Sequence, residues 1–207
     1  MLQFLIKGGV VMIPLLFCSF LGLVIIIERC IFFSRLNKWE EQETKLLRLY
    51  VGQGRLDEAR TVTAGWRSPL GRVANSALKQ YELDKSNLEA AIHRAGEQEV
   101  RRMQRGLGLL DTVVTASPLL GLLGTVTGII RSFTALSVVG SAQSAQLSMG
   151  IAEALYTTAF GLSIAIPALF FLNWFYGIAE QQAEKLTGGA QELLSILNKG
   201  QVKQDGV

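Results

Sequence analysis

The sequence has few of the residues from which most metal and catalytic sites are built. It contains one histidine and two cysteines among 207 residues, which argues against a histidine-based metal site and a disulfide framework. Charged residues make up 18% of the chain, where soluble domains typically have about 25%. It carries no nucleotide-binding loop and no nucleophile paired with a base. We therefore expect no enzyme activity, no metal site and no cofactor.

Charge is missing altogether from three long runs. They cover residues 8–27, 112–130 and 154–179. At a rise of 1.5 Å per residue, the shortest run would span about 28 Å as a helix, close to a bilayer hydrocarbon core of about 30 Å. Only helices and closed barrels satisfy every backbone polar group in lipid, and runs of this length are typical of helices. The sequence therefore predicts an all-α integral membrane protein with three transmembrane helices.

The first run has an alternative interpretation as a secretory signal peptide. A signal core has about 7–15 apolar residues and is followed by a cleavage site with small residues. Here the run is longer, and Glu28 and Arg29 are followed by further apolar residues where cleavage would occur. A retained helix is the favoured interpretation.

Positive charge is concentrated between the first and second runs. Of the 20 lysines and arginines, 15 lie between Arg29 and Arg105. Because positively charged segments beside spans tend to stay in the cytoplasm, we predict a cytoplasmic C-terminus and an N-terminus on the opposite, periplasmic side. The predicted layout is a first transmembrane helix in 1–28, a cytoplasmic helical segment in 29–108, a second transmembrane helix in 109–136, a short periplasmic loop in 137–149, a third transmembrane helix in 150–179, and a cytoplasmic helix and tail in 180–207.

Turn residues divide the cytoplasmic segment into short helices. Glycines and a proline at 52–54 and 65–69 predict the turns. Ser86 and Glu89 have the spacing of a capping box, which predicts a helix start. No proline follows until Pro118, so one helix is predicted to continue from the cytoplasm into the second span, and the third span is likewise predicted to extend into the cytoplasm. The charged residues before the second span are expected to form a solvated face, with a docking surface as the alternative; they are Glu97, Glu99, Arg101, Arg102 and Arg105.

Small residues recur four apart along the second and third runs. Such stripes let helix backbones approach closely in lipid. Two stripes on the third run suit neighbours on two sides, so we predict a homo-oligomeric ring; packing within one hairpin is the alternative. The glycines assigned to helix packing are Gly121, Gly124, Gly128 and Gly161.

Glu153 is a carboxylate at the edge of the third run. A charge inside a membrane helix costs about 2.5–3.5 kcal/mol on insertion scales and usually serves a function. The alternative is a position at the outer interface, where ionisation costs little. With a turn centred near residue 141 or 142, Thr125 and Thr158 share one depth, and Arg131 and Glu153 share another. An ion pair between Arg131 and Glu153 would lower the cost of both charges.

Two segments resemble a known family at these residues. Residues 122–133 (LLGTVTGIIRSF) and 150–162 (GIAEALYTTAFGL) look like the MotA/TolQ/ExbB proton-channel family, most closely its ExbB/TolQ branch. The resemblance is strongest over 117–175. It departs at Arg131, where a small polar residue is common, and this leaves the charge balance near the outer mouth open.

The resemblance implies a pentamer in the bacterial inner membrane around the transmembrane helices of a smaller, ExbD- or TolR-like single-span partner. That partner carries an essential membrane aspartate, which is protonated as protons enter, and the pentamer turns relative to it. Work is then passed, through a TonB- or TolA-like protein, to outer-membrane transport or envelope maintenance. By position, Thr125 and Thr158 match the family's pore threonines, with Thr157 beside them, and Glu153 matches its glutamate; Arg131 is a possible charge partner.

The predicted function is therefore a proton-channel or motor subunit that uses the proton motive force. A passive membrane scaffold that recruits partners through its cytoplasmic helices is the main alternative. A small-solute transporter is a further one, although its usual internal repeats and broken helices are not visible in the sequence. The sequence leaves open an ExbB or a TolQ role, and sodium in place of protons. We expect contact with the lipid bilayer and none with nucleic acid.

Overall fold

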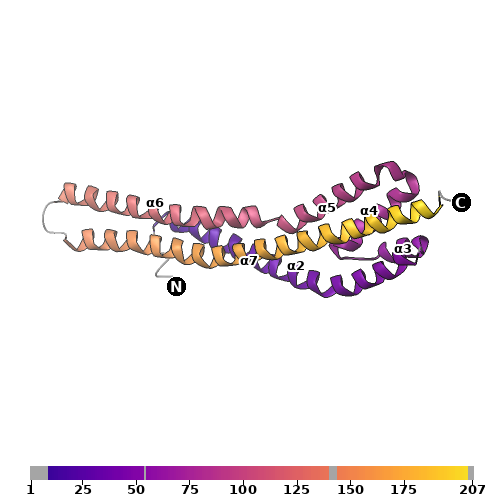
Figure 1. The fold of residues 1–207 in the computed structure, drawn as a ribbon. Helices are drawn as coiled ribbons and strands as arrows, with labels where there is room; N and C mark the ends of the chain where they lie inside the picture. The colour runs from indigo at the N-terminus through magenta and orange to yellow at the C-terminus, as the bar shows by residue number, and fades with distance from the viewer. Residues whose placement is uncertain (1–8, 54, 140–143, 205–207) are drawn as a thin grey trace. The chain divides into compact units, whose positions relative to one another are not determined.

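The fold is built from helices (Figure 1). The computed structural model describes residues 9–53, 55–139 and 144–204, and all regular elements within these ranges are helical. In chain order they are α2 (Met12–Gly52), α3 (Leu56–Thr63), α4 (Pro69–Leu83), the 3-10 turn η1 (Lys85–Asn87), α5 (Leu88–Gln104), α6 (Leu107–Val139) and α7 (Ser144–Gln204). The predicted turns at 52–54 and 65–69 fall where α2 ends and where α4 begins.

Among the described residues, three stretches of helix are long and apolar enough to cross a membrane. They lie within Met12–Leu36, Leu88–Thr134 and Gly150–Leu197, and they overlap the three uncharged runs. The chain divides into two compact units: a membrane unit of residues 1–29 and 106–175, and a second unit of residues 30–105 and 176–207. The protein is thus an all-α membrane protein with three candidate spans, and α7 continues well beyond the third uncharged run.

Within the membrane unit, α6 and the first part of α7 pack along each other through glycines (Figure 1). A Cβ built on Gly124 would lie 2.3 Å from Oγ1 of Thr157, and one on Gly161 would lie 2.5 Å from the carbonyl oxygen of Ser117. Gly121 and Gly128 make similarly close approaches to α7. The small-residue stripes are therefore used within one hairpin, and they do not by themselves indicate a neighbouring subunit.

The outward faces of the membrane unit carry large apolar side chains. Examples on all three helices are Phe17, Phe20, Leu119, Phe133 and Phe170, each more than 60% exposed in the single chain. A soluble surface seldom exposes so many contiguous apolar groups, whereas lipid or a neighbouring membrane helix covers them at no cost. Their arrangement fits the assignment of this unit to the membrane.

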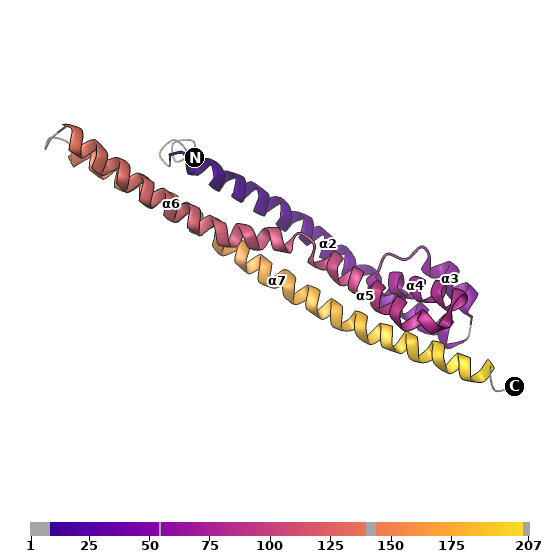
Figure 2. The same cartoon turned by 90° about the horizontal axis from the view of Figure 1, so that it is seen from above.

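The prediction of one helix from the cytoplasm into the second span is wrong. The helical path is broken between α5 and α6 at Arg105 and Gly106 (Figure 2). Arg105 has an extended ψ of 133° and Gly106 a φ of +81°, a region that glycine enters readily and other residues do not. A Cβ on Gly106 would lie 3.9 Å from Ile25 and 3.8 Å from Nε of Arg29, so the break lies against α2.

The predicted capping box is also wrong. Asn87, not Ser86, occupies the N-cap position of α5, and its side chain makes no capping hydrogen bond. Ser86 instead donates its hydroxyl and its backbone N–H to Oδ1 of Asp84, at 2.7 and 2.9 Å. Asp84 thus closes an Asx-type turn with Ser86, and η1 leads from this turn into α5.

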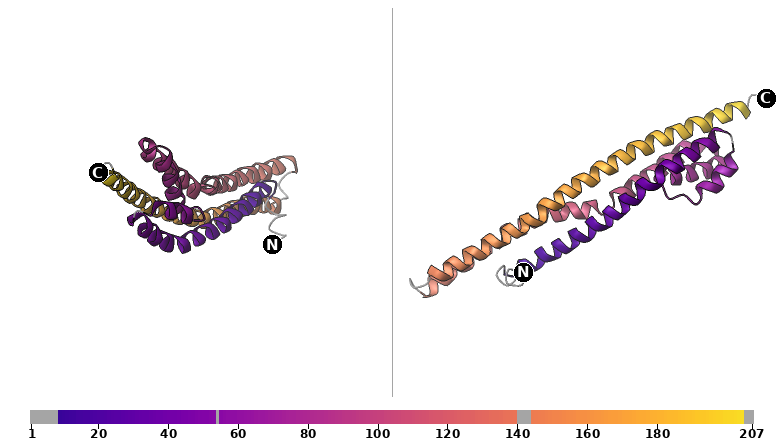
Figure 3. Two further views of the ribbon diagram at one scale, coloured as in Figure 1. Left: turned by 90° about the vertical axis from the view of Figure 1, so that its right-hand side faces the viewer. Right: turned by 90° about the horizontal axis from the view of Figure 1, so that it is seen from below.

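A buried carboxylate fixes the start of α4 in the second unit. Glu43 on α2 accepts the backbone N–H groups of Arg67 and Ser68 at 3.2 and 3.0 Å. Ser68 in turn caps α4 by accepting the N–H of Gly71 at 3.0 Å. Since the first amides of a helix have no partner within it, these bonds hold the short helices beside α2 (Figure 3).

Glu99 contradicts the prediction of a wholly solvated charged face on α5. It is only 5% exposed, and its carboxylate accepts Nε of Arg72 on α4 at 2.7 Å. Arg72 closes a second, parallel contact through Nη2, and Arg102 adds a contact at 3.2 Å. The neighbouring Glu97 does lie in solvent, paired with Arg101 and His93.

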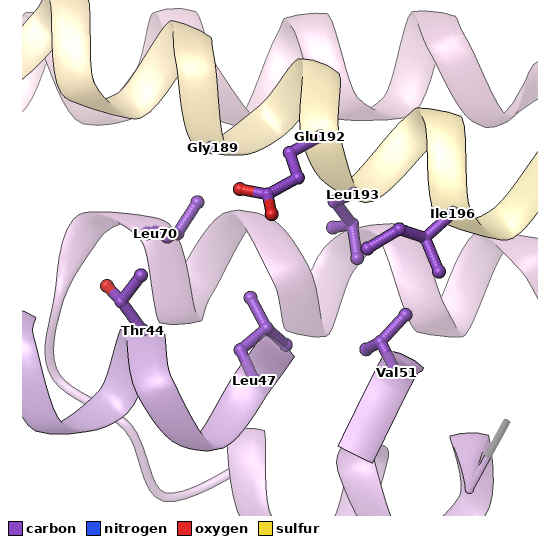
Figure 4. A pocket seen from close by; sticks show the side chains of 8 residues that line it. All are labelled: Thr44, Leu47, Val51, Leu70, Gly189, Glu192, Leu193 and Ile196. Carbon is purple, nitrogen blue, oxygen red and sulfur yellow. The ribbon is translucent and has the colours of Figure 1, made fainter. Parts of the chain in front are cut away.

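The contact between α2, α4 and α7 in the same unit is tightly filled (Figure 4). The cavity there measures about 10 Å³, which is close to the least space that one water molecule needs. Its walls are formed by Leu47, Val51, Leu70, Leu193 and other residues of the three helices. A Cβ built on Gly189 would lie 2.7 Å from Leu70, so α7 and α4 are in direct contact.

Candidate functional site

Two threonine hydroxyls meet between α6 and α7, as the hairpin spacing predicts. The Oγ1 atoms of Thr125 and Thr158 are 3.4 Å apart. Thr158 also donates to the carbonyl oxygen of Gly121 at 3.0 Å, and Thr125 to that of Leu122 at 2.6 Å. Close approach is possible because Gly121 has no side chain: a Cβ there would lie 3.0 Å from the main chain of Thr158.

Thr157 lies deeper in the helix contact than the other two threonines. It is 1% exposed, and its hydroxyl donates to the carbonyl oxygen of Ala154 at 2.8 Å. Its side chain fills the space opposite Gly124. Thr125 and Thr158, by contrast, are both partly exposed in the single chain, so a neighbouring molecule has access to them.

The structure also brings Arg131 and Glu153 together, as the same spacing predicts. Nη1 of Arg131 lies 3.7 Å from Oε1 of Glu153. The arginine side chain is 59% exposed and the glutamate side chain 31% exposed in the single chain. The pair is therefore loose, and Glu153 stays accessible to water or to a partner. Arg131 thus places a positive charge beside Glu153.

Gly9 was not singled out from the sequence, but it lies at the same place. A Cβ built on Gly9 would lie 2.2 Å from Oε1 of Glu153. The contact joins segments more than 140 residues apart. The only sequence pattern that could have drawn attention to it is the Gly8-Gly9 pair ahead of the first apolar run.

The described residues offer little chemistry elsewhere. They contain no cluster of three or more histidine, cysteine, aspartate or glutamate side chains that could hold a metal ion. A groove of about 560 Å³ lies between α5 and α7 in the second unit, and its lining includes the apolar Ile92 and Leu186 and the charged Glu97 and Arg101. The one hydroxyl among its lining residues, that of Thr187, donates to the carbonyl oxygen of Ala183 on its own helix. The polar groups between α6 and α7 are the better candidates for function.

Residues 65–187, more than half of the chain, match the MotA/TolQ/ExbB proton channel family. This chain belongs to that family. Similarity to individual members extends further: the chain is 38% identical over 192 residues to the biopolymer transport protein ExbB-like 1 of Synechocystis sp., covering 91% of this chain and 75% of the relative.

Two further relatives represent both named branches of the family. The chain is 35% identical over 174 residues to the biopolymer transport protein ExbB of Salmonella typhimurium, with 76% of this chain and 71% of the relative covered. It is 39% identical over 109 residues to the Tol-Pal system protein TolQ of Pseudomonas aeruginosa, with 53% and 47% covered. The resemblance stated from residues 122–133 and 150–162 is confirmed. The protein therefore has a role of the proton-channel family in energising transport, a role outside the known enzyme classes.

Proposed function

We propose that the chain is an inner-membrane proton-channel subunit that passes the energy of the proton motive force to a partner. In this proposal several copies, a pentamer by family, surround the single spans of an ExbD- or TolR-like protein that carries a membrane aspartate. A TonB- or TolA-like protein then receives the work. The observation that carries the proposal is the pair of partly exposed hydroxyls, Thr125 and Thr158, held 3.4 Å apart between the two helices of the hairpin.

The hydrogen bonding of this threonine pair suits a protonated carboxyl group. A threonine hydroxyl has one hydrogen to donate and two lone pairs to accept. Thr158 gives its hydrogen to Gly121 and Thr125 gives its hydrogen to Leu122. Both oxygens then remain as acceptors, which favours a neutral, protonated acid as their partner over an ionised one. The threonines cannot carry protons at neutral pH, so the titrating acid comes from the partner protein.

Glu153 supplies the charge at the other end of the polar segment. The partly exposed carboxylate of Glu153 attracts protons. Its ion pair with Arg131, at 3.7 Å, is loose enough to open when a proton arrives. Each elementary charge that crosses 100 mV provides about 2.3 kcal/mol, so repeated proton entry is needed for mechanical work. In our proposal Glu153 gathers protons on the periplasmic side, and the threonine pair receives the protonated partner further in.

The proposal is tested with proton uptake by proteoliposomes that contain the full chain and an ExbD- or TolR-like single-span protein from the same organism. We expect Glu153→Gln to abolish uptake. Thr158→Val should lower its rate by about three- to tenfold, the factor that one hydrogen bond of about 1 kcal/mol provides. Thr127→Val is the matched control, because within the described residues the Thr127 hydroxyl bonds to carbonyl oxygens of its own helix, those of Leu123 and Gly124.

Two outcomes would refute the proposal. Unchanged uptake in both variants, at equal amounts of assembled protein, would leave a passive scaffold. Uptake of sodium instead of protons in ion-replacement experiments would show that the transported ion is sodium.

Two further measurements define the complex and its role. Co-purification with the partner, followed by mass measurement, gives the number of copies. Growth that depends on outer-membrane uptake, or on envelope integrity, separates an ExbB from a TolQ role.

A further inference from the structure

The main chain at the start of the first span contacts the ion pair between α6 and α7. Gly9 has a φ of +63°, and its carbonyl oxygen accepts the N–H of Met12 at 3.1 Å, which opens the turn leading into α2. A Cβ built on Gly9 would lie 2.2 Å from Oε1 of Glu153 and 3.3 Å from Nη1 of Arg131. The segment that leads into α2 therefore meets α6 and α7 at one carboxylate.

We propose that Gly9 is a positioning residue for Glu153, because any side chain at position 9 would displace the carboxylate from its place beside Arg131. This inference rests on the proposed function, and it adds the first span to the proton pathway. The proposal accounts for both the positive φ of Gly9 and its close approach to Glu153. A turn at this position would require the positive φ alone.

The long distance between Arg131 and Glu153 explains why the position of the glutamate depends on a second contact, with Gly9. The separation of 3.7 Å between Nη1 and Oε1, with a mostly exposed arginine, gives Arg131 a weak hold on a glutamate that has three rotatable bonds. The missing side chain of Gly9 leaves the space that the carboxylate occupies, since a built Cβ would lie 2.2 Å from Oε1 and 3.5 Å from Cδ of Glu153. A shift at the start of the first span consequently changes where the carboxylate of Glu153 lies.

The test measures the reactivity of Glu153 with a hydrophobic carbodiimide, which attacks protonated carboxyl groups. The full chain is used in native-lipid nanodiscs, and the modified peptide is quantified by mass spectrometry, so neither the partner protein nor proton flow is required. In Gly9→Ala the new methyl group takes the position that Oε1 of Glu153 holds, so the carboxylate turns out of its contact with Arg131. The displaced carboxylate becomes more accessible to the reagent, and we expect labelling to accelerate by about fivefold.

Two variants separate this contact from backbone strain. Gly106→Ala is the matched control, since Gly106 also has a positive φ, of +81°, but its added Cβ would meet no atom closer than 3.8 Å; it should leave the labelling of Glu153 unchanged. Glu153→Asp is the size rescue, because its carboxylate is one methylene shorter. In that background Gly9→Ala should no longer change the labelling rate at position 153.

Arg131→Gln completes the comparison. It should accelerate labelling by itself, and Gly9→Ala should then add nothing, because the interaction that it disrupts is already gone. The proposal is overturned if Gly9→Ala labels at the wild-type rate, if Gly106→Ala accelerates labelling equally, or if Gly9→Ala has the same effect in the Glu153→Asp background.

If the Gly9→Ala protein accumulates poorly in cells, the amounts of the other variants still test the contact between Gly9 and Glu153. If the Gly9→Ala/Glu153→Asp double variant accumulates, the rescue itself supports the contact. If both fail while Gly106→Ala accumulates, something other than Glu153 excludes a side chain at position 9, and the proposal is wrong. Labelling is independent of transport, so a result against Gly9 leaves the proposed function standing, whereas proton uptake by Glu153→Gln tests that function alone.

Discussion

Single residues decide how closely the helices of the membrane unit approach, and Gly124 is the clearest case. Its hydrogen atom faces Thr157, and a Cβ would lie 2.3 Å from Oγ1 and 2.6 Å from Cβ of that residue. Gly124→Ala should therefore lower the free energy of unfolding by about 1–3 kcal/mol through overpacking. Thermal unfolding of the full chain in detergent measures the change.

Gly108→Ala is the control on the same helix, because a Cβ at Gly108 would meet nothing within 4 Å. There the substitution should stabilise the helix, by about 0.5–1 kcal/mol. Equal effects of the two substitutions would contradict the close contact between α6 and α7.

Glu99 is the residue whose burial has the largest expected effect in the second unit. Glu99→Gln leaves the guanidinium of Arg72 without its charge partner, and losing one member of a buried pair costs about 3–5 kcal/mol. We expect the lower end, since the Arg72 side chain keeps 30% exposure. Glu97→Gln, two residues away and half exposed, should cost only about 0–1 kcal/mol. Chemical denaturation of both variants distinguishes the two glutamates, and similar midpoints would contradict the burial of Glu99.

At the scale of elements, the stability of the turn at the C-terminal end of α4 depends on pH. The side-chain hydroxyl of Ser86, then its backbone N–H and the amide of Asn87, hold the pKa of Asp84 below its ordinary value. A pKa lowered in the folded state gives a stabilisation that is present above the unfolded pKa of about 3.9 and is lost as pH falls through the folded value.

The corresponding measurement is the thermal midpoint as a function of pH. Asp84→Asn should lower the midpoint at neutral pH, and the difference from the wild type should shrink below about pH 4. Asp57→Asn, on the exposed first turn of α3, serves as the control for the loss of an aspartate. A constant difference across this pH range would contradict a contribution from the ionised carboxylate.

Elements with strong local patterns could be predicted from the sequence, whereas those set by distant contacts could not. The uncharged runs identified the spans, and equal distances from the turn identified the Thr125–Thr158 and Arg131–Glu153 pairs, because two antiparallel helices rise at the same rate. The break at Gly106 was missed because a single glycine is also tolerated inside a helix. Glu99 and Gly9 were missed because their partners lie 27 or more residues away.

At the scale of the whole molecule, the positive charges predict the side of the membrane on which each part lies. In a variant without Cys18 and Cys30, we expect a cysteine at position 83, where Leu83 is 82% exposed, to react with an impermeant maleimide only after cells are permeabilised. A cysteine at position 141 should react in intact cells. Position 141 and the turn it tests lie outside the described residues. The opposite labelling pattern would invert the orientation.

The glycine-lined contact between α6 and α7 also has a consequence for the proposed function. Sliding one helix along the other would bring side chains to Gly124 and Gly161, where even a methyl group would overlap the facing helix. We therefore expect the membrane-spanning parts of α6 and α7 to keep their mutual register. In the proposed function, rotation would take place along the outward surfaces, where leucine and phenylalanine side chains can exchange neighbours.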